Sequence, residues 1–234
     1  NVNRMLERID ELVENSKNIS GNIAHDLKKP LTKLKSNLEL LSLKVKNKNS
    51  IQYISQAIIE ADNLIKIFNA LLDIAGFESE KKHDFKLIKI SSLMNSIIEI
   101  YKPVIEEKKI ILKNNIQSNL KLFGNKILLT QCFTNIIDNA IKYSKNDKNS
   151  FIEINLFMEN NSIYIEFRDN GEGIDEKDFN RVFDRFVRLE KHRQTTGNGL
   201  GLSMVKAILK LHEAPISLSD NKPGLIVSIM FKKT

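Results

Sequence analysis

Two glycine-rich segments carry most of the chemistry that this sequence suggests. Residues 169–174 (DNGEGI) and 197–202 (GNGLGL) hold five of the nine glycines of the chain. Glycine has no Cβ, so its backbone can adopt positive φ and a ligand can come close to its N–H groups, as a phosphate-bearing cofactor requires. Either segment alone is equally well explained as an ordinary turn, because short glycine motifs occur by chance. Together they favour a nucleotide site.

The sequence around these segments predicts how they are held. Residues 162–168 alternate apolar and polar side chains like a half-buried strand, which places Asp169 at the exposed end of that strand. Residues 202–211 repeat apolar side chains at helical spacing, so the second segment leads into a helix. The free N–H groups and the positive dipole end of that helix would face an anion.

A polar stripe precedes both segments. Gln131, Asn135, Asn139 and Lys142 are spaced by four, four and three residues, so they share one face of a predicted helix. Two asparagines on one face favour ligand binding, because an amide oxygen can coordinate a hard divalent cation while a lysine meets a phosphate oxygen. A solvated surface stripe is the alternative, and it would be preferred without the glycine segments.

The fourth candidate is His25, in the segment HDLKKPLT of residues 25–32. Asp26 can accept a hydrogen bond from one ring nitrogen, which leaves the lone pair of the other nitrogen free as a nucleophile. Pro30 is predicted to bend the helix just beyond the histidine. A surface histidine usually has no function, so the nucleotide site is what favours a functional role. Apolar residues at coiled-coil-like spacing form a predicted seam on this helix: Leu6, Ile9, Val13, Ile23, Leu27, Leu34, Leu38, Leu41 and Val45.

The order of the segments HDLKKPLT, NIIDNAIKY, DNGEGI, FDRF and GNGLGL resembles the cytoplasmic core of the sensor histidine kinases of two-component systems. Five motifs in a fixed order are far more specific than any one of them. The resemblance covers nearly the whole chain. It implies a protein histidine kinase that phosphorylates His25 with ATP and passes the phosphoryl group to an aspartate of a response-regulator receiver domain.

The same resemblance assigns roles to individual residues. Asn139 is the expected Mg²⁺ ligand, assisted by Asn135, and Asp169 is the expected acceptor for the adenine amino group. Arg188 is expected at the γ-phosphate, and Phe183 and Phe186 are expected either as lid anchors or as core residues. The remaining expected ATP-binding residues are Lys142, Tyr143, Gly171, Gly173, Ile174, Gly197, Gly199, Leu200, Gly201 and Leu202. Residues 176–196 are the expected lid.

The fold class expected from these patterns is α+β in two domains. Residues 1–80 are predicted as an antiparallel helical hairpin, with helices to about residue 46 and over residues 51–75, that forms a dimeric four-helix bundle and carries the phosphoacceptor histidine. The segment near Gly76 is the predicted hinge. Residues 81–234 are predicted as a two-layer α/β sandwich, which by resemblance is the ATP-binding fold of histidine kinases and Hsp90. Helices are expected over residues 91–108, 125–143 and 199–212, with strands over residues 86–90, 110–116, 151–158, 162–169, 216–219 and 225–231.

Composition limits the other classes of function and location that the chain could have. The formal charge of +7 comes with scattered lysines and no tryptophan, which argues against a nucleic-acid surface. Cys132 is the one cysteine, which fits a reducing compartment, and no apolar run reaches membrane-spanning length. With the homodimer implied by the hairpin seam and the resemblance, we expect a cytoplasmic protein without membrane contact by this segment, or the cytoplasmic part of a membrane-anchored sensor. His83 and His212 have no partners at metal-ligand spacing and are expected to be structural.

Two other functions stay open from the sequence. One is an ATP-driven conformational switch like Hsp90 or MutL, and the other is a scaffold that binds nucleotide without turnover.

One departure from the family pattern also stands out. Many family members that dephosphorylate their regulator carry Thr or Asn four residues after the histidine, where this chain has Lys29. A lysine ammonium cannot accept a hydrogen bond from water, so weak phosphatase activity is expected.

Overall fold

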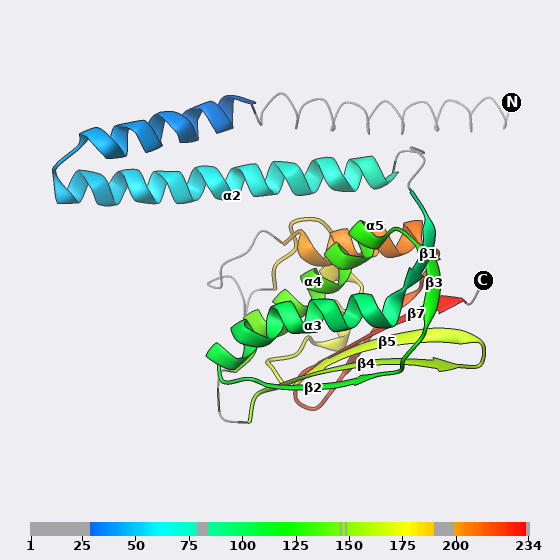
Figure 1. The fold of residues 1–234 in the computed structure, drawn as a ribbon. Helices are drawn as coiled ribbons and strands as arrows, with labels where there is room; N and C mark the ends of the chain where they lie inside the picture. The colour runs from blue at the N-terminus through cyan, green and yellow to red at the C-terminus, as the bar shows by residue number, and fades with distance from the viewer. Residues whose placement is uncertain (1–28, 79–83, 146, 148, 190–198, 233–234) are drawn as a thin grey trace, which may run out of the picture. The chain divides into compact units, whose positions relative to one another are not determined.

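The computed structural model describes residues 29–78, 84–145, 147, 149–189 and 199–232 (Figure 1). The chain divides into two compact units, residues 1–81 and 82–234. The roles that the sequence assigns to these two units remain predictions. None of the helices in the described ranges is both long enough and apolar enough to cross a membrane.

The first unit contains an antiparallel pair of helices. One spans residues 29–44 of the described chain, and α2 (Lys48–Glu78) returns alongside it (Figure 1). The Asn47 side chain accepts hydrogen bonds from the N–H groups of Asn49 and Ser50, at 2.9 and 3.3 Å, which explains why α2 begins earlier than expected. Lys35 Nζ lies 2.7 Å from Asp62 Oδ1 and links the two helices.

The helix α2 also corrects the expected break at Gly76. It continues through this glycine to Glu78 rather than ending near residue 75. A glycine inside a helix costs only about 1 kcal/mol relative to alanine, which a helix of 31 residues can absorb. The glycine therefore does not end the helix. The bend expected at Pro30 stays a prediction, because the residues before it lie outside the described ranges.

The second unit is a mixed sheet covered by helices. Its elements in chain order are β1 (Lys86–Lys89), α3 (Ile90–Glu107), β2 (Ile111–Ile116), β3 (Lys121–Gly124), α4 (Lys126–Lys142), β4 (Phe151–Glu159), β5 (Ser162–Asp169), the 3₁₀ turns η1 (Glu176–Asp178) and η2 (Arg181–Phe183), α5 (Gly201–Leu211), β6 (Ile216–Asp220) and β7 (Leu225–Lys232). The five-stranded sheet has the order β2-β4-β5-β7-β6. Only β2 and β4 run parallel; the other neighbouring strands are antiparallel.

The helices α3, α4 and α5 lie on one face of this sheet (Figure 1). Their apolar faces meet the inward-facing side chains of the strands, among them Phe133 of α4 and Ile165 of β5, both at 0% exposure. Cys132 is also buried in this layer, and burial raises the pKa of its thiol well above the usual range. The expected α+β class, with a helical first part and a two-layer second part, is confirmed.

One strand is missing from the sequence prediction. The short strand β3 pairs with β1 in a separate two-stranded sheet, in which Leu87 lies opposite Phe123. Its four residues are too few to show a period of two convincingly, so only pairing with a distant segment reveals it.

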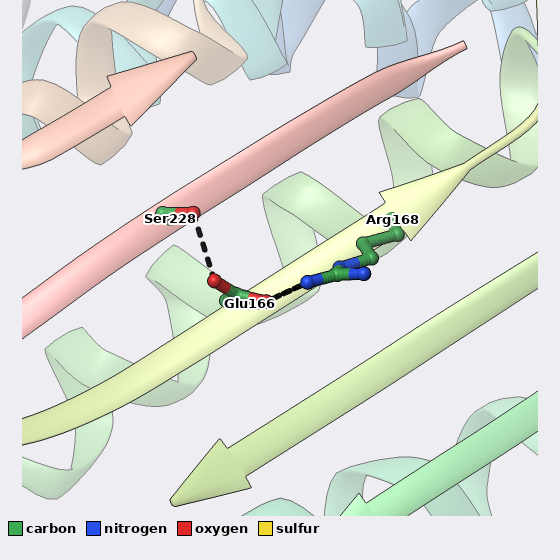
Figure 2. A network of polar contacts seen from close by, with 3 residues as sticks. All are labelled: Glu166, Arg168 and Ser228. Carbon is green, nitrogen blue, oxygen red and sulfur yellow. Dashed lines mark hydrogen bonds and ion pairs between the residues drawn. The ribbon is translucent and has the colours of Figure 1, made fainter. Parts of the chain in front are cut away.

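The open face of the sheet carries polar side chains. Arg168 Nη2 donates to Glu166 Oε2 at 2.6 Å, and Ser228 Oγ of β7 lies 3.5 Å from Glu166 Oε1 (Figure 2). Glu166 and Arg168 alternate along β5 with the buried Ile165 and Phe167. Because the alternation has a period of two, Asp169 belongs to the same face as Phe167, the face that the helices cover.

Candidate functional site

The polar stripe predicted from the sequence lies on α4. Asn125 caps this helix by accepting hydrogen bonds from the N–H groups of Ile127 and Leu128, at 3.0 and 3.1 Å. The opposite face of α4 is buried against the sheet, which fixes the direction of the stripe. Asn139 and Lys142 of the stripe line a cavity. Lys142 Nζ donates to the hydroxyl of Tyr143 at 3.0 Å and lies 4.6 Å from the centre of its ring.

Asp169 lines the same cavity at the end of β5. Its Oδ1 accepts a hydrogen bond from the N–H of Gly171 at 2.8 Å. Burial raises the pKa of this carboxyl group, and backbone hydrogen bonds from Gly171 and Leu225 oppose that rise. The site therefore holds one carboxylate in surroundings that disfavour its charge. A ligand group that donates a hydrogen bond to it would stabilise the charged form.

Two glycines of the glycine-rich segments have a backbone conformation that other residues rarely adopt. Gly173 has φ +69° and Gly199 has φ +66°. A Cβ on Gly173 would stand 2.9 Å from the carbonyl oxygen of Gly224, and one on Gly199 would stand 2.8 Å from that of Val187. These glycines are required by the backbone of the cavity wall itself.

Gly201 differs from them, because it begins α5 without positive φ. A Cβ there would have room, at 3.8 Å from Asn139 Nδ2 and 4.0 Å from Asn135 Oδ1. The N-cap residue Leu200 has no side-chain acceptor, and no side chain among the described residues caps the first N–H groups of α5. A helix N-terminus of this kind suits an anion at this end of the cavity. The start of α5 thus faces the two asparagines of α4 directly.

The cavity encloses about 270 Å³. Most of its wall is apolar, and its polar groups are Asn139, Lys142, Tyr143, Asp169 and Arg188. The apolar wall residues are Ile136, Ala140, Phe167, Ile174, Val182, Val187, Leu189, Leu202, Leu225 and Val227. A narrow apolar space with one acid, bounded by a helix N-terminus, a lysine and an arginine, suits a flat ring that carries phosphates.

Most of the expected binding residues come together here. Asn139, Lys142, Tyr143, Asp169, Gly173, Ile174, Arg188, Gly199, Gly201 and Leu202 line the cavity. Asn135 and Gly171 border it, as their contacts with Gly201 and Asp169 show, and Leu200 is buried beside it at 4% exposure. His25, Asp26 and Gly197 lie outside the described residues. Their expected roles stay predictions.

The expected lid is described as far as residue 189. Its first part contains the turns η1 and η2. Phe183 is half-buried, and Lys206 Nζ lies 5.7 Å from its ring centre. Phe186 is 55% exposed and has φ +63°, and its backbone N–H donates a hydrogen bond to the carbonyl of Gly199 at 3.0 Å. The alternative that both phenylalanines are core residues is therefore wrong for Phe186, because more than half of its surface is open to solvent.

Several wall residues were not anticipated from the sequence. Phe167, Leu225 and Val227 reach the cavity because strand alternation aims them inward beside Asp169. Gly224 has φ +115°, and a Cβ there would overlap the carbonyl oxygen of Asp169. The Pro-Gly pair of residues 223–224 was the available signal, because it marks a tight turn.

Within the described ranges, no cluster of three or more His, Cys, Asp or Glu side chains could hold a metal ion. His212 instead has a structural setting: its Nε2 accepts the N–H of Asn125 at 3.0 Å, and its ring lies 4.7 Å from that of Phe85. At the end of the cavity where α5 begins, the side-chain oxygens of Asn135 and Asn139 lie near Gly201. They fit a hard divalent cation that takes its other ligands from phosphates and water.

Two protein-family models match the chain. One describes the His Kinase A (phospho-acceptor) domain and matches residues 15–80. The other describes the histidine kinase-, DNA gyrase B-, and HSP90-like ATPase and matches residues 124–234.

Curated relatives and solved structures agree with these models. The chain is 31% identical over 217 residues to the sensor histidine kinase WalK of Bacillus subtilis, covering 90% of this chain and 35% of WalK. It is 31% identical over 214 residues to the heme sensor protein HssS of Staphylococcus saprophyticus, covering 91% of this chain and 45% of HssS. The chain thus spans less than half the length of either relative. Full-length ShkA, solved in complex with AMPPNP, superposes with a TM-score of 0.77 at 18% identity, over 92% of this chain and 45% of ShkA. The chain belongs to the sensor histidine kinases: its first part matches the phosphoacceptor model and its second part matches the ATPase model.

Proposed function

We propose that this chain uses ATP to phosphorylate His25 and then passes the phosphoryl group to an aspartate on a response-regulator receiver domain. The observation that carries the proposal is the cavity of the second unit, where Asp169, Asn139 and Lys142 meet the start of α5. It occurs in a chain whose first unit matches the phosphoacceptor family over a range that includes His25. A phosphorus–nitrogen bond would form at His25 as ADP leaves.

ATP is the nucleotide that this cavity suits best. The buried carboxylate of Asp169 can accept a hydrogen bond from the exocyclic amino group of adenine, which guanine does not offer at that position. The apolar wall would hold the ring, and Lys142 and Arg188 would meet the phosphates. The nucleotide complex of the ShkA structure supports this choice of ligand.

Magnesium would be held mainly by Asn139, assisted by Asn135. Their amide oxygens both lie 4.0 Å from the position of a Cβ on Gly201, at the end of the cavity where the α5 N-terminus opens. When bound, Mg²⁺ would supply charge neutralisation for the phosphates. The chain itself would orient the phosphates with Lys142 and the N–H groups of α5.

The surface of the helical hairpin supports the proposal that the chain forms a homodimer. Buried apolar residues are few in the described part of this unit, where Ile54 and Ala61 are below 9% exposure. Large apolar side chains stay open in the single chain: Leu34, Leu40, Leu41, Leu43, Tyr53, Ile59 and Leu64, at 43 to 82% exposure. A second hairpin would cover them in a four-helix bundle, and burial of this apolar surface would stabilise the assembly by roughly 25 cal/mol per Å² buried. The family supports the proposal of a receiver-domain partner and of a cytoplasmic location.

The decisive experiment compares His25→Gln with the unaltered chain after incubation with γ-labelled ATP. We expect no acid-labile label on the variant and unchanged ATP binding, because the nucleophile and the cavity lie in different units. Label that persists on His25→Gln would overturn the assignment. Label absent from both, with ATP hydrolysed, would favour the Hsp90-like switch, and ATP bound without turnover would favour the scaffold.

The roles of Asp26 and Asn139 are tested by exchanging the acid for its amide at position 26 and the amide for its acid at position 139. Asp26→Asn should slow phosphorylation without abolishing it, because an amide still bonds to the ring but stabilises its cation poorly. Asn139→Asp should weaken use of Mg²⁺ and ATP, because a new negative charge repels the phosphates. A wild-type rate in either variant would remove that residue from the proposed mechanism.

A further inference from the structure

Met204 of α5 makes a contact that the family resemblance does not anticipate. Its sulfur accepts two side-chain amides of α4, Gln131 Nε2 at 3.0 Å and Asn135 Nδ2 at 3.4 Å. Met204 itself is buried at 5% exposure. The two helices pack along this contact, and the Asn135 amide joins it to Gly201, which lines the cavity.

The spacing of residues on the two helices explains the arrangement. On α4, Gln131, Asn135 and Asn139 follow one another at four-residue steps along one face. On α5, Gly201 and Met204 are three residues apart and share the facing side. Gly201 therefore stands opposite Asn135 and Asn139, and Met204 stands opposite Gln131 and Asn135.

This places the two ends of the Asn135 amide in different surroundings. Its NH₂ group points at the Met204 sulfur, and its oxygen lies toward Gly201, at 4.0 Å from the position of a Cβ there. A thioether sulfur has no hydrogen to donate and can only accept. The NH₂ end is therefore the one that belongs at Met204, and the oxygen is left facing the cavity side.

We propose that Met204 is a positioning residue that holds the oxygen of Asn135 toward the divalent cation of the bound nucleotide. The proposal rests on the proposed function, because it assumes that Mg²⁺ and ATP occupy this cavity. Amide oxygen is the end that ligates a hard cation, whereas the NH₂ end would repel it. An apolar side chain at position 204 would fill the same space but leave the amide free to rotate. Magnesium binding would then have to select one of two amide orientations.

The test uses Met204→Leu in the full chain, with Met94→Leu as the matched control. A Met to Leu exchange conserves volume and is usually well tolerated in a core. Met94 of α3 is also buried, at 0% exposure, and is not among the cavity residues. Met204→Ile repeats the test should the leucine variant fail to fold, as judged by its thermal midpoint.

The first readout is the affinity for AMPPNP by calorimetry, in Mg²⁺ and in EDTA. In EDTA, we expect Met204→Leu to bind AMPPNP with wild-type affinity. In Mg²⁺, the increase in affinity should be about fivefold smaller than in the wild type, which corresponds to one ordinary hydrogen bond. Met94→Leu should keep the full Mg²⁺ effect. In an Asn135→Ala background, Met204→Leu should have no further effect on Mg²⁺ dependence.

The second readout needs no ligand. The side-chain amide resonances of Asn135 and Gln131 in a ¹⁵N spectrum should shift in Met204→Leu and stay in place in Met94→Leu. Wild-type binding with an unaltered Mg²⁺ effect in Met204→Leu would overturn this inference alone. Absence of AMPPNP binding by the wild type would overturn the proposed function and this inference with it.

Discussion

The side-chain amide of Asn221 donates a hydrogen bond of 2.8 Å to the backbone carbonyl of Asp169. It fastens the turn between β6 and β7 to the strand end that carries the acid of the cavity. Gly224 of the same turn packs against that carbonyl so closely that no side chain would fit. The position of Asp169 is thus set by a segment 52 residues later in the chain, and the predictions for the site begin with this acid.

Asp169→Asn is expected to lower ATP affinity by roughly 10- to 100-fold, because a hydrogen bond to a charged acceptor would be lost or weakened. Calorimetric titration with AMPPNP measures this directly. Glu166→Gln is the matched control, since Glu166 lies on the same strand but on the open face of the sheet. Equal losses in both variants would mean that the effect comes from the strand and not from the cavity.

The same variant has a predictable dependence on pH. Burial raises the pKa of Asp169 in the folded chain above its ordinary value of 3.8, so the ionised carboxylate destabilises the fold at neutral pH. This cost is present above the folded pKa and is relieved as the pH falls through it toward 3.8. Asp169→Asn should therefore unfold at a higher temperature than wild type at pH 7, and the difference should shrink as the pH falls. A difference that is constant with pH would contradict the assignment.

Gly201→Ala and Gly199→Ala are expected to behave differently although the two glycines belong to one motif. Gly201→Ala should keep its melting temperature, because a Cβ there meets Asn139 and Asn135 only at ordinary contact distances. Its methyl group would nevertheless stand between the asparagine oxygens and the phosphates, and Mg²⁺-dependent ATP binding should fall. Gly199→Ala should lose stability by about 1 kcal/mol or more, because φ +66° strains an alanine. Thermal unfolding and calorimetric titration with AMPPNP would check this difference between the two variants. A Gly201→Ala variant that binds AMPPNP normally in Mg²⁺ would refute it.

His212→Leu should destabilise the second unit by about 2 to 4 kcal/mol. The exchange removes the acceptor of the Asn125 N–H at the start of α4 and the ring contacts with Phe85 and Phe231. Since a backbone N–H can only donate, Nε2 is the bare nitrogen, and Nδ1 lies 2.8 Å from the carbonyl of Ile208 to which it can donate. Urea denaturation measures the loss. An unchanged midpoint would show that these contacts contribute little.

Lys29→Thr is expected to speed dephosphorylation of a phosphorylated response regulator. Lys29 is exposed in the helix of residues 29–44, and its ammonium group can donate to water but cannot accept from it. A threonine hydroxyl can do both. Purified phosphorylated regulator would be followed with each protein, and Lys33→Thr on the same helix serves as the control. Rapid loss of phosphate with wild type, unimproved by Lys29→Thr, would contradict the prediction.

The sequence by itself determined the elements that hold the site. The four-residue steps of α4 placed Asn139 and Lys142 on one side and Phe133 on the other, because helical periodicity is a local property. The alternation of residues 162–168 placed Asp169 at the end of its strand for the same reason, and the structure adds that its side chain belongs to the inward face. The bounds of β5 were predicted without error, and those of α4 to within one residue at each end.

Only the tertiary structure decided which distant residues complete the site. Nothing near Asp169 in the sequence indicates that Asn221 and Gly224 would fix its backbone, and nothing near Asn135 indicates that Met204 would accept its amide. The strand β3 likewise became visible only through its pairing with β1. Local periodicity determines the face on which a side chain lies. The partner that it meets there depends on how separate elements pack, and that is settled by the shape and burial of the whole unit.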